Sequence, residues 1–164
     1  MQFSTLNESE LHKKLKTIYA IQNNGQTEVS KNGYFYDIFT SENEVIEIQT
    51  KNLAHLLPKI LNTLDKGYKI KLVHPVVITK TIKTFDKENN LISKRKSPKK
   101  GSIYDIFREL TQLYQILLNP DFTLEILEIN MTDERLKTEA PVQSKNKKRR
   151  YKKDWVKINK KLDE

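Results

Sequence analysis

Two short stretches, YFYDIFT at residues 34–40 and VIEIQT at residues 45–50, decide the fold of this 164-residue chain. Both are rich in aromatic and β-branched residues, which is typical of strands. The turn SENE between them predicts an antiparallel hairpin. In such a hairpin Asp37 and Glu47 can converge on one face. Because an acid inside a strand is costly unless it is paired or binds a cation, this pair is the first candidate for a functional site.

Helical and strand patterns alternate on both sides of the hairpin. Before it, apolar residues at helical spacing predict a helix over residues 8–22, and the polar residues 26–31 are consistent with a short edge strand. After it, a leucine and isoleucine stripe predicts a helix over 52–66, and alternation predicts a strand over 68–78. The resulting order of helix, three strands, helix and strand is typical of an α/β domain.

The ends of these helices carry recognisable capping residues. Asn7 followed by Glu10 resembles a capping box at the start of the first helix. For the second helix we expect Asn52 as the N-cap, Gly67 as the C′ residue and a kink at Pro58.

The second half of the chain continues with a basic hairpin, a helix and a strand. TKTIKTF and LISKRKS flank the turn DKENN, so a hairpin is expected within residues 77–100. Residues 102–118 show the clearest helical pattern, with a capping pair formed by Ser102 and Asp105. The stretch FTLEILEI at 122–129 predicts a strand.

The last segment is polar and basic. Near its end Trp155, Ile158 and Leu162 have a spacing that predicts one apolar side of a short helix. We therefore expect residues 140–164 to be a basic tail or linker with a short helix, or the start of a further domain.

Charge is distributed unevenly along the chain. Residues 141–164 hold ten Lys and Arg against three acids, and residues 79–100 hold eight against two. Since the whole chain has a net charge of +9, the remainder is mildly acidic. Two basic extensions on an acidic body favour binding of a polyanion such as a nucleic acid. The alternative explanation is solubilising surface charge.

Composition excludes several classes of protein. No cysteine is present, which excludes disulfides, thiolate nucleophiles and cysteine-ligated metal centres. Only four glycines occur and no phosphate-binding loop motif is found, so nucleotide-binding folds of that kind are poorly supported. The first residues lack the apolar core of a signal peptide, and no apolar run reaches the length of a membrane span. We expect a cytoplasmic protein that does not contact membranes.

The acid pair predicts a metal site. Two carboxylates at one point disfavour joint ionisation, and a hard divalent cation such as Mg²⁺ or Mn²⁺ relieves that repulsion. The carbonyl of Ile48 is a natural further ligand. A metal at this site would support phosphodiester hydrolysis by activating a bound water. Gln49 can orient water but carries no charge, so Lys51 is the candidate for the missing cation.

The stretch from Asp37 through Glu47, Gln49 and Lys51, followed by a helix and a strand, resembles the PD-(D/E)xK nuclease superfamily. Archaeal Holliday-junction resolvases and many restriction endonucleases share that layout. The resemblance covers residues 8–76 and implies a restriction-endonuclease-like core, a mixed central β-sheet flanked by helices.

For the site, the resemblance implies metal binding at Asp37, Glu47 and the Ile48 carbonyl. It also implies an assisting acid on the first helix or strand, for which Glu10 and Glu28 are the candidates. Two positions depart from the family pattern: Tyr36 replaces the motif proline and Gln49 replaces the signature lysine. Either Lys51 compensates for Gln49, or the chain is a nuclease fold without cleavage.

These observations give one main hypothesis. Residues 1–139 form a nuclease-like α/β domain with its core at 8–76, its basic hairpin at 77–100, and a helix and strand at 102–130. Its function is metal-dependent hydrolysis of DNA, or of nucleic acid generally. The alternatives are a catalytically inactive nucleic-acid-binding module of the same fold and a protein-interaction domain with a basic tail. A homodimer is compatible with all three hypotheses, and so is a partner domain beyond the C-terminus.

We expect the nucleic acid to contact the basic side chains of the hairpin and the tail. These are Lys80, Lys83, Lys94, Arg95, Lys96, Lys99, Lys100, Lys147, Lys148, Arg149 and Arg150.

Overall fold

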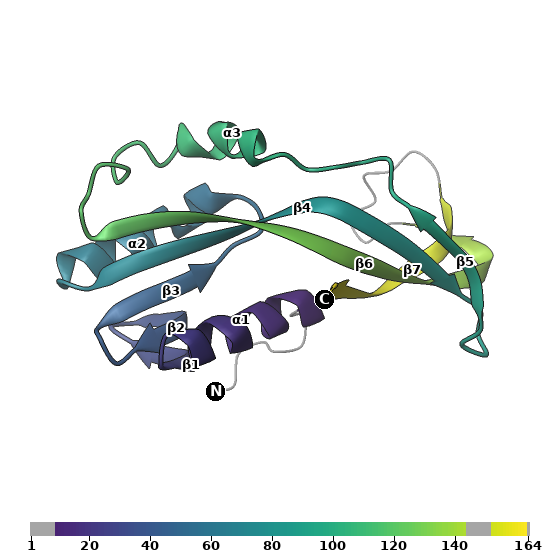
Figure 1. Ribbon diagram of the computed structural model, residues 1–164, viewed down its shortest axis with the longest axis horizontal. Coiled ribbons are helices and arrows are strands. Elements are labelled where there is room, and N and C mark those ends of the chain that lie inside the picture. The colour runs from purple at the N-terminus through teal and green to yellow at the C-terminus, as the bar shows by residue number, and fades with distance from the viewer. Residues whose placement is uncertain (1–8, 144–151, 164) are drawn as a thin grey trace. The chain divides into compact units, whose positions relative to one another are not determined.

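A computed structural model describes residues 9–143 and 152–163. They form an α/β structure with a mixed β-sheet and a few helices, as the sequence predicts (Figure 1). The chain divides into two compact units. The first, here called the α/β unit, combines residues 12–76 and 101–128; the second, the β unit, combines residues 77–100 with both ends of the chain, 1–11 and 129–164.

The α/β unit begins with a helix and a three-stranded antiparallel meander. These elements are α1 (Glu10–Gln22), β1 (Gly25–Lys31), β2 (Tyr34–Thr40) and β3 (Glu44–Ile48). Strand β2 pairs antiparallel with both β1 and β3. The predicted first helix, edge strand and hairpin are therefore confirmed. Asn7, the other half of the predicted capping box, lies outside the described residues.

The chain then crosses over to a strand that is parallel to β3. The crossover contains a 3₁₀ turn, η2 (Leu53–Leu56), and the helix α2 (Leu57–Asp65), and it leads into β4 (Lys69–Phe85). The parallel register runs from Glu44 opposite Lys69 to Ile48 opposite Val73.

The predicted helix over 52–66 exists, but its start differs from the prediction. Pro58 occupies the first turn of α2, where its missing N–H is not needed, so it begins the helix rather than kinking it. Asn52 precedes the 3₁₀ turn with a left-handed φ of 54° and makes no side-chain capping bond. Gly67 has a φ of 76°, as expected of a C′ glycine.

Residues 101–128 complete the α/β unit. The capping box of Ser102 and Asp105 is confirmed, but the long helix predicted over 102–118 is wrong. A 3₁₀ turn, η3 (Ile103–Ile106), is followed by only four residues of α-helix, α3 (Phe107–Leu110). Further on, the backbone bonds link residues three apart, as in the bond from the Leu113 N–H to the Leu110 carbonyl. These tighter turns carry the chain to β6 (Phe122–Val142).

Ile106, Leu113 and Ile116 of this segment are buried, whereas Tyr114 and Leu118 are exposed. The tighter turns thus keep the apolar positions that the helical pattern placed in the core. The buried cluster joins β2, β3, α2, β4 and β6 and comprises Tyr36, Val45, Leu53, Ile60, Ile70, Leu72, Ile106, Leu113, Ile116 and Phe122.

The β unit is built from two antiparallel pairs. Strand β4 pairs with β5 (Leu91–Lys96), which confirms the basic hairpin. Strand β6, longer than predicted, pairs with β7 (Lys153–Leu162). The predicted C-terminal helix is therefore wrong. Cross-strand pairing overrides the helical spacing there, with Trp155 directly opposite Lys137. None of the described helices is long and apolar enough to cross a membrane.

Candidate functional site

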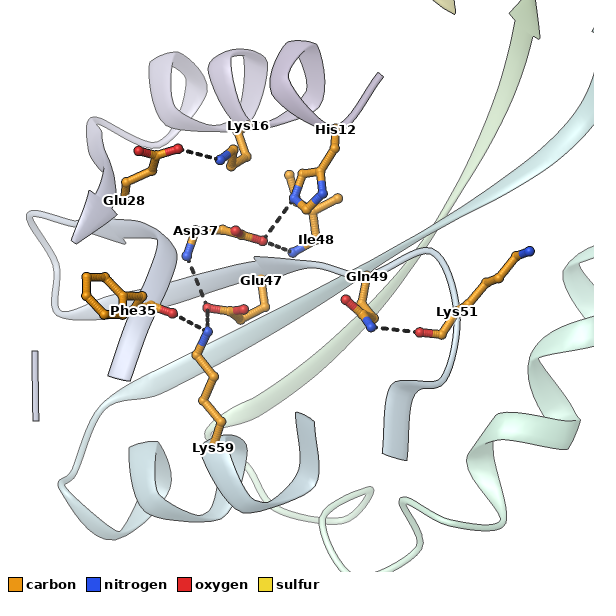
Figure 2. Close-up of polar contacts among 10 residues, drawn as sticks. All are labelled: His12, Lys16, Glu28, Phe35, Asp37, Glu47, Ile48, Gln49, Lys51 and Lys59. Carbon is orange, nitrogen blue, oxygen red and sulfur yellow. Dashed lines mark hydrogen bonds and ion pairs between the residues drawn. The ribbon is translucent and has the colours of Figure 1, made fainter. Parts of the chain in front are cut away.

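The two acids of the hairpin lie where β2 and β3 stop exchanging backbone hydrogen bonds. The last paired residues are Ile38 with Ile46 and Phe39 with Val45. One step further, acid side chains replace the ladder (Figure 2).

Each acid accepts a bond from the strand that carries the other. The Asp37 N–H donates to Glu47 Oε1 at 3.1 Å, and the Ile48 N–H donates to Asp37 Oδ2 at 2.9 Å. The sequence brings the two acids together, and each of them also satisfies a backbone donor.

Asp37 is held in its charged form. Its Oδ2 also lies 3.2 Å from Nε2 of His12, which α1 presents. Burial alone would raise the pKa of Asp37. The hydrogen bonds from His12 and the Ile48 N–H, together with the charges of His12 and Lys16, outweigh burial and lower this pKa below its ordinary value. The carboxylate is thus an ionised acceptor, so His12 Nε2 is the donor.

Glu47 has the opposite electrostatic character. It is only 4% exposed, and its Oε1 lies 2.6 Å from Nζ of Lys59 on α2. Burial raises the pKa of Glu47, the nearby charge of Asp37 raises it further, and Lys59 only partly opposes them, leaving the pKa at about 7. Two neighbouring acids with separated pKa values are typical of functional sites.

Lys59 is fixed by more than the ion pair. Its ammonium also donates to the Phe35 carbonyl at 2.5 Å and lies 5.0 Å from the centre of the Tyr36 ring. The Tyr36 hydroxyl in turn lies 3.0 Å from Thr63 Oγ1, on the same helix as Lys59. Figure 2 shows α1 and α2 on opposite sides of the strands, with His12 and Lys59 reaching the acids from each side.

The two residues expected to follow along the strand do not join the site. Strand β3 ends at Ile48, so Lys51 no longer shares a strand face with Glu47, and its exposed side chain points away from the acids in Figure 2. Gln49 donates from Nε2 to the Lys51 carbonyl at 2.7 Å. The chain turns here because Asn52 takes a left-handed φ.

The two accessory acids contact other partners. Glu28 on β1 accepts from Lys16 at 3.0 Å, and Glu10 accepts from the side-chain amide of Asn159, both of these residues belonging to the β unit. The bonds described for these two acids do not involve Asp37 or Glu47.

Asp37 and Glu47 are the side chains of this site that could hold a hard divalent cation of the magnesium type. Within residues 9–143 and 152–163, no group of three or more His, Asp or Glu side chains is placed to hold a metal ion. Mg²⁺, however, commonly uses one or two carboxylates and completes its shell with water and substrate phosphate.

The free oxygens of the site support that fit. The bonds described for Asp37 end on Oδ2 and those for Glu47 on Oε1, which leaves Oδ1 and Oε2 for a cation. The Ile48 carbonyl points to the same side of its strand as the Ile48 N–H, which is the Asp37 side.

Sequence reasoning missed His12 and Lys59 as members of the site. One feature of the sequence could have indicated Lys59: it is the single Lys or Arg between Lys51 and Lys66. No such feature indicates His12, because its role depends on how α1 packs against the sheet.

The predicted nucleic-acid contacts lie in the β unit as far as they are described. On β5, Lys94, Arg95 and Lys96 are all exposed. Lys94 lies directly opposite Lys83 on β4. Like charges in this position destabilise a hairpin unless an opposite charge lies nearby. Burial lowers the pKa of Lys80, and the neighbouring cations Lys157, Arg135 and Lys99 add to this effect. Four of the predicted residues, Lys147, Lys148, Arg149 and Arg150, lie outside the described residues.

Comparison with known proteins identifies a family but no activity. A family model described as "Domain of unknown function (DUF8091)" matches residues 9–164. An uncharacterized protein of Treponema pallidum (strain Nichols) is 29% identical over 130 residues, which cover 79% of this chain and 51% of that protein. The chain thus spans about half the length of this curated relative. No solved structure shows significant similarity.

Proposed function

The chain belongs to the DUF8091 family, and from its own site we propose that it is a metal-dependent nuclease that hydrolyses phosphodiester bonds in nucleic acid. One observation carries the proposal. Asp37 and Glu47 meet where strands β2 and β3 diverge, and the pKa of Asp37 is lowered whereas that of Glu47 is raised. Lys59 forms an ion pair with Glu47.

The element order supports placing the chain near the PD-(D/E)xK superfamily. A helix, an antiparallel three-stranded meander, a crossover helix and a strand parallel to the third follow one another from α1 to β4. In our proposal this segment is the restriction-endonuclease-like core of the molecule.

Each residue of the site has a proposed role. Asp37, Glu47 and the Ile48 carbonyl would hold Mg²⁺ or Mn²⁺, which when bound lowers the pKa of a water and offsets charge on the phosphate. His12 orients the Asp37 carboxylate by donating to Oδ2. Lys59 supplies the positive charge beside Glu47 that Gln49 lacks, in the role that Lys51 was expected to fill.

A nucleic-acid-binding module without cleavage is the second candidate. The observation that favours it is the bonding of both acids to backbone N–H groups, because this gives the pair a structural role that needs no metal. The opposed lysines of the basic hairpin, Lys83 and Lys94, fit both candidates. Both a nuclease and a binding module would bring a polyanion to the hairpin, and a polyanion would offset the repulsion between these two lysines.

Calorimetric titration with Mg²⁺ and Mn²⁺ and a nuclease assay on single- and double-stranded substrates separate the two candidates. We expect wild-type protein to bind metal and cleave, and Glu47→Gln to lose both. Lys59→Gln should lose cleavage while keeping metal binding, because Lys59 is not a metal ligand. The matched control is Lys51→Gln, which removes an exposed charge outside the site and should cleave normally.

The other outcomes reject parts of the proposal. Absence of metal binding by the wild type would reject the metal site. Metal binding without cleavage of any substrate would favour the binding module. A loss of cleavage in Lys51→Gln but not in Lys59→Gln would mean that the roles of the two lysines are assigned wrongly.

A further inference from the structure

The β unit contains a pocket that the proposed cleavage reaction does not use. Its volume is about 320 Å³, and its walls come from the β4–β5 hairpin and the β6–β7 pair. This is several times the roughly 30 Å³ that one water occupies and lies at the lower end of the range for small-ligand sites. The pocket is therefore large enough for more than a solvated ion.

Most of the charged side chains that line the pocket are cationic. Arg95 from β5 and Arg135 and Lys137 from β6 line it, against the single acid Asp154. Alternation along the strands places Arg135 and Lys137 on the same face of β6. A pocket with three cations and one carboxylate attracts an anionic group, and guanidinium groups match the geometry of phosphate oxygens.

Arg135 is oriented before any ligand arrives. One of its terminal nitrogens donates to Asp133 Oδ2 at 3.2 Å, and Asp133 is only 1% exposed. Its guanidinium carbon also lies 3.6 Å from the ring centre of Trp155. Because the side chain is held on two sides, little conformational entropy is lost when it binds a phosphate. One bond to Asp133 leaves most of its five donors for other partners.

The pocket wall also has an apolar part, formed by Trp155 and Ile92, and Ile92 is 49% exposed. Arg135 and Lys153 both lie against the Trp155 ring, at 3.6 and 3.7 Å from its centre, so Ile92 and the rest of Trp155 provide the apolar contact. A bare phosphate or polyphosphate has nothing to place against such a wall, whereas a nucleotide offers a sugar and a base beside its phosphate. A base held in a concave site cannot remain stacked within a duplex, so the strand must be single there.

We propose that this pocket binds one nucleotide of a single-stranded nucleic acid. Its phosphate contacts Arg95, Arg135 and Lys137, and its sugar or base packs against Ile92 and Trp155. The inference names a ligand class for a site separate from the acid pair, and it stands whether or not the chain cleaves its ligand.

Trp155 makes the test direct, because it is the only tryptophan in the chain. Its fluorescence is followed while a short oligothymidylate is added to the full chain in the presence of a metal chelator. We expect a saturable change in Trp155 emission. An unchanged emission in a protein that binds the oligonucleotide by another measure, such as anisotropy, would overturn the proposal.

Charge variants then locate the binding. Arg95→Gln and Lys137→Gln should each weaken oligothymidylate binding about tenfold, as expected for loss of one charge-assisted hydrogen bond to phosphate. The matched control is Lys87→Gln, on the turn of the same hairpin, where Lys87 pairs with Glu139 at 2.7 Å in an exposed position. An equal effect of all three substitutions would mean that only overall charge matters, and would reject the pocket.

Competitors distinguish a nucleotide site from a general anion site. Inorganic polyphosphate and blunt duplex DNA should compete more weakly than oligothymidylate at equal phosphate concentration. If polyphosphate competes equally well, the apolar wall has no part in binding and the proposal is wrong. Because the titration is made with a metal chelator and measures binding alone, a failure of the proposed nuclease function would leave this result unaffected.

Discussion

Replacement of the buried acid Glu47 by glutamine should change how the stability of the protein depends on pH. The pKa of Glu47 rises from an ordinary value of 4.5 to about 7 in the folded state. Because the folded protein then binds this proton more tightly than the unfolded chain, the protonated acid stabilises the fold. That stabilisation is complete below pH 4.5 and is lost as the pH rises through about 7.

The size of the effect follows from the same two pKa values. Their difference corresponds to about 3 kcal/mol at about 1.4 kcal/mol per pKa unit. The wild type should lose this contribution to its free energy of unfolding between pH 4.5 and about pH 8. Glu47→Gln cannot lose it, because glutamine does not titrate, while its carbonyl still accepts from the Asp37 N–H and from Lys59.

Urea unfolding of metal-free protein at a series of pH values, followed by circular dichroism, measures the effect. The free energy of unfolding of Glu47→Gln minus that of the wild type should increase by about 3 kcal/mol from the acid to the alkaline end. Glu44→Gln on the same strand, where Glu44 is half-buried, is the matched control for the loss of one carboxylate, and a profile parallel to the wild type there would assign the change to Glu47. Parallel profiles for Glu47→Gln as well would refute the reasoning that burial and Asp37 disfavour the charge.

Other substitutions in the α/β unit test the fold and the site. Ile60→Ala should cost about 2–5 kcal/mol in urea unfolding because Ile60 is fully buried, whereas its neighbour Leu61→Ala, 42% exposed, should cost much less. Gly67→Ala should cost about 1–2 kcal/mol from the left-handed φ alone, since nothing lies within 4 Å of the added methyl group; a neutral effect would mean that the turn relaxes. In the nuclease assay, Lys59→Arg should retain more cleavage than Lys59→Gln because it keeps the charge beside Glu47, and equal activities would argue against an electrostatic role.

The sequence predicts the part of the fold in which local pattern and tertiary packing agree. The hairpin of β2 and β3 follows from β-branched and aromatic residues on either side of a short polar turn. Gly67 and the Ser102–Asp105 box were predictable because each ends or begins a helix by local backbone chemistry. The proximity of Asp37 and Glu47 follows from the hairpin alone.

The errors arise where tertiary contacts outweigh the local pattern. The spacing of Trp155, Ile158 and Leu162 suits a helix, but β6 offers a long unpaired edge, and pairing makes the segment a strand. In residues 102–118 backbone bonds between residues three apart replace most of the expected helix, although Leu113 and Ile116 are buried as the helical pattern predicts.

The partners of the acid pair were beyond sequence reasoning for a related reason. Lys59 comes from the other end of a crossover and His12 from a helix that precedes the meander, and no spacing rule links either residue to Glu47 or Asp37. Lys51 does not share a strand face with Glu47 because β3 ends at Ile48, where the sequence pattern allowed the strand to continue.

The mutual capping of β2 and β3 by Asp37 and Glu47 affects how these acids can change during evolution. A chain that no longer needed metal chemistry would still leave two backbone N–H groups without acceptors if it replaced them with apolar residues. Selection for a stable sheet is therefore sufficient to preserve both acids. The presence of both acids in a relative therefore indicates this strand junction and does not by itself indicate catalysis.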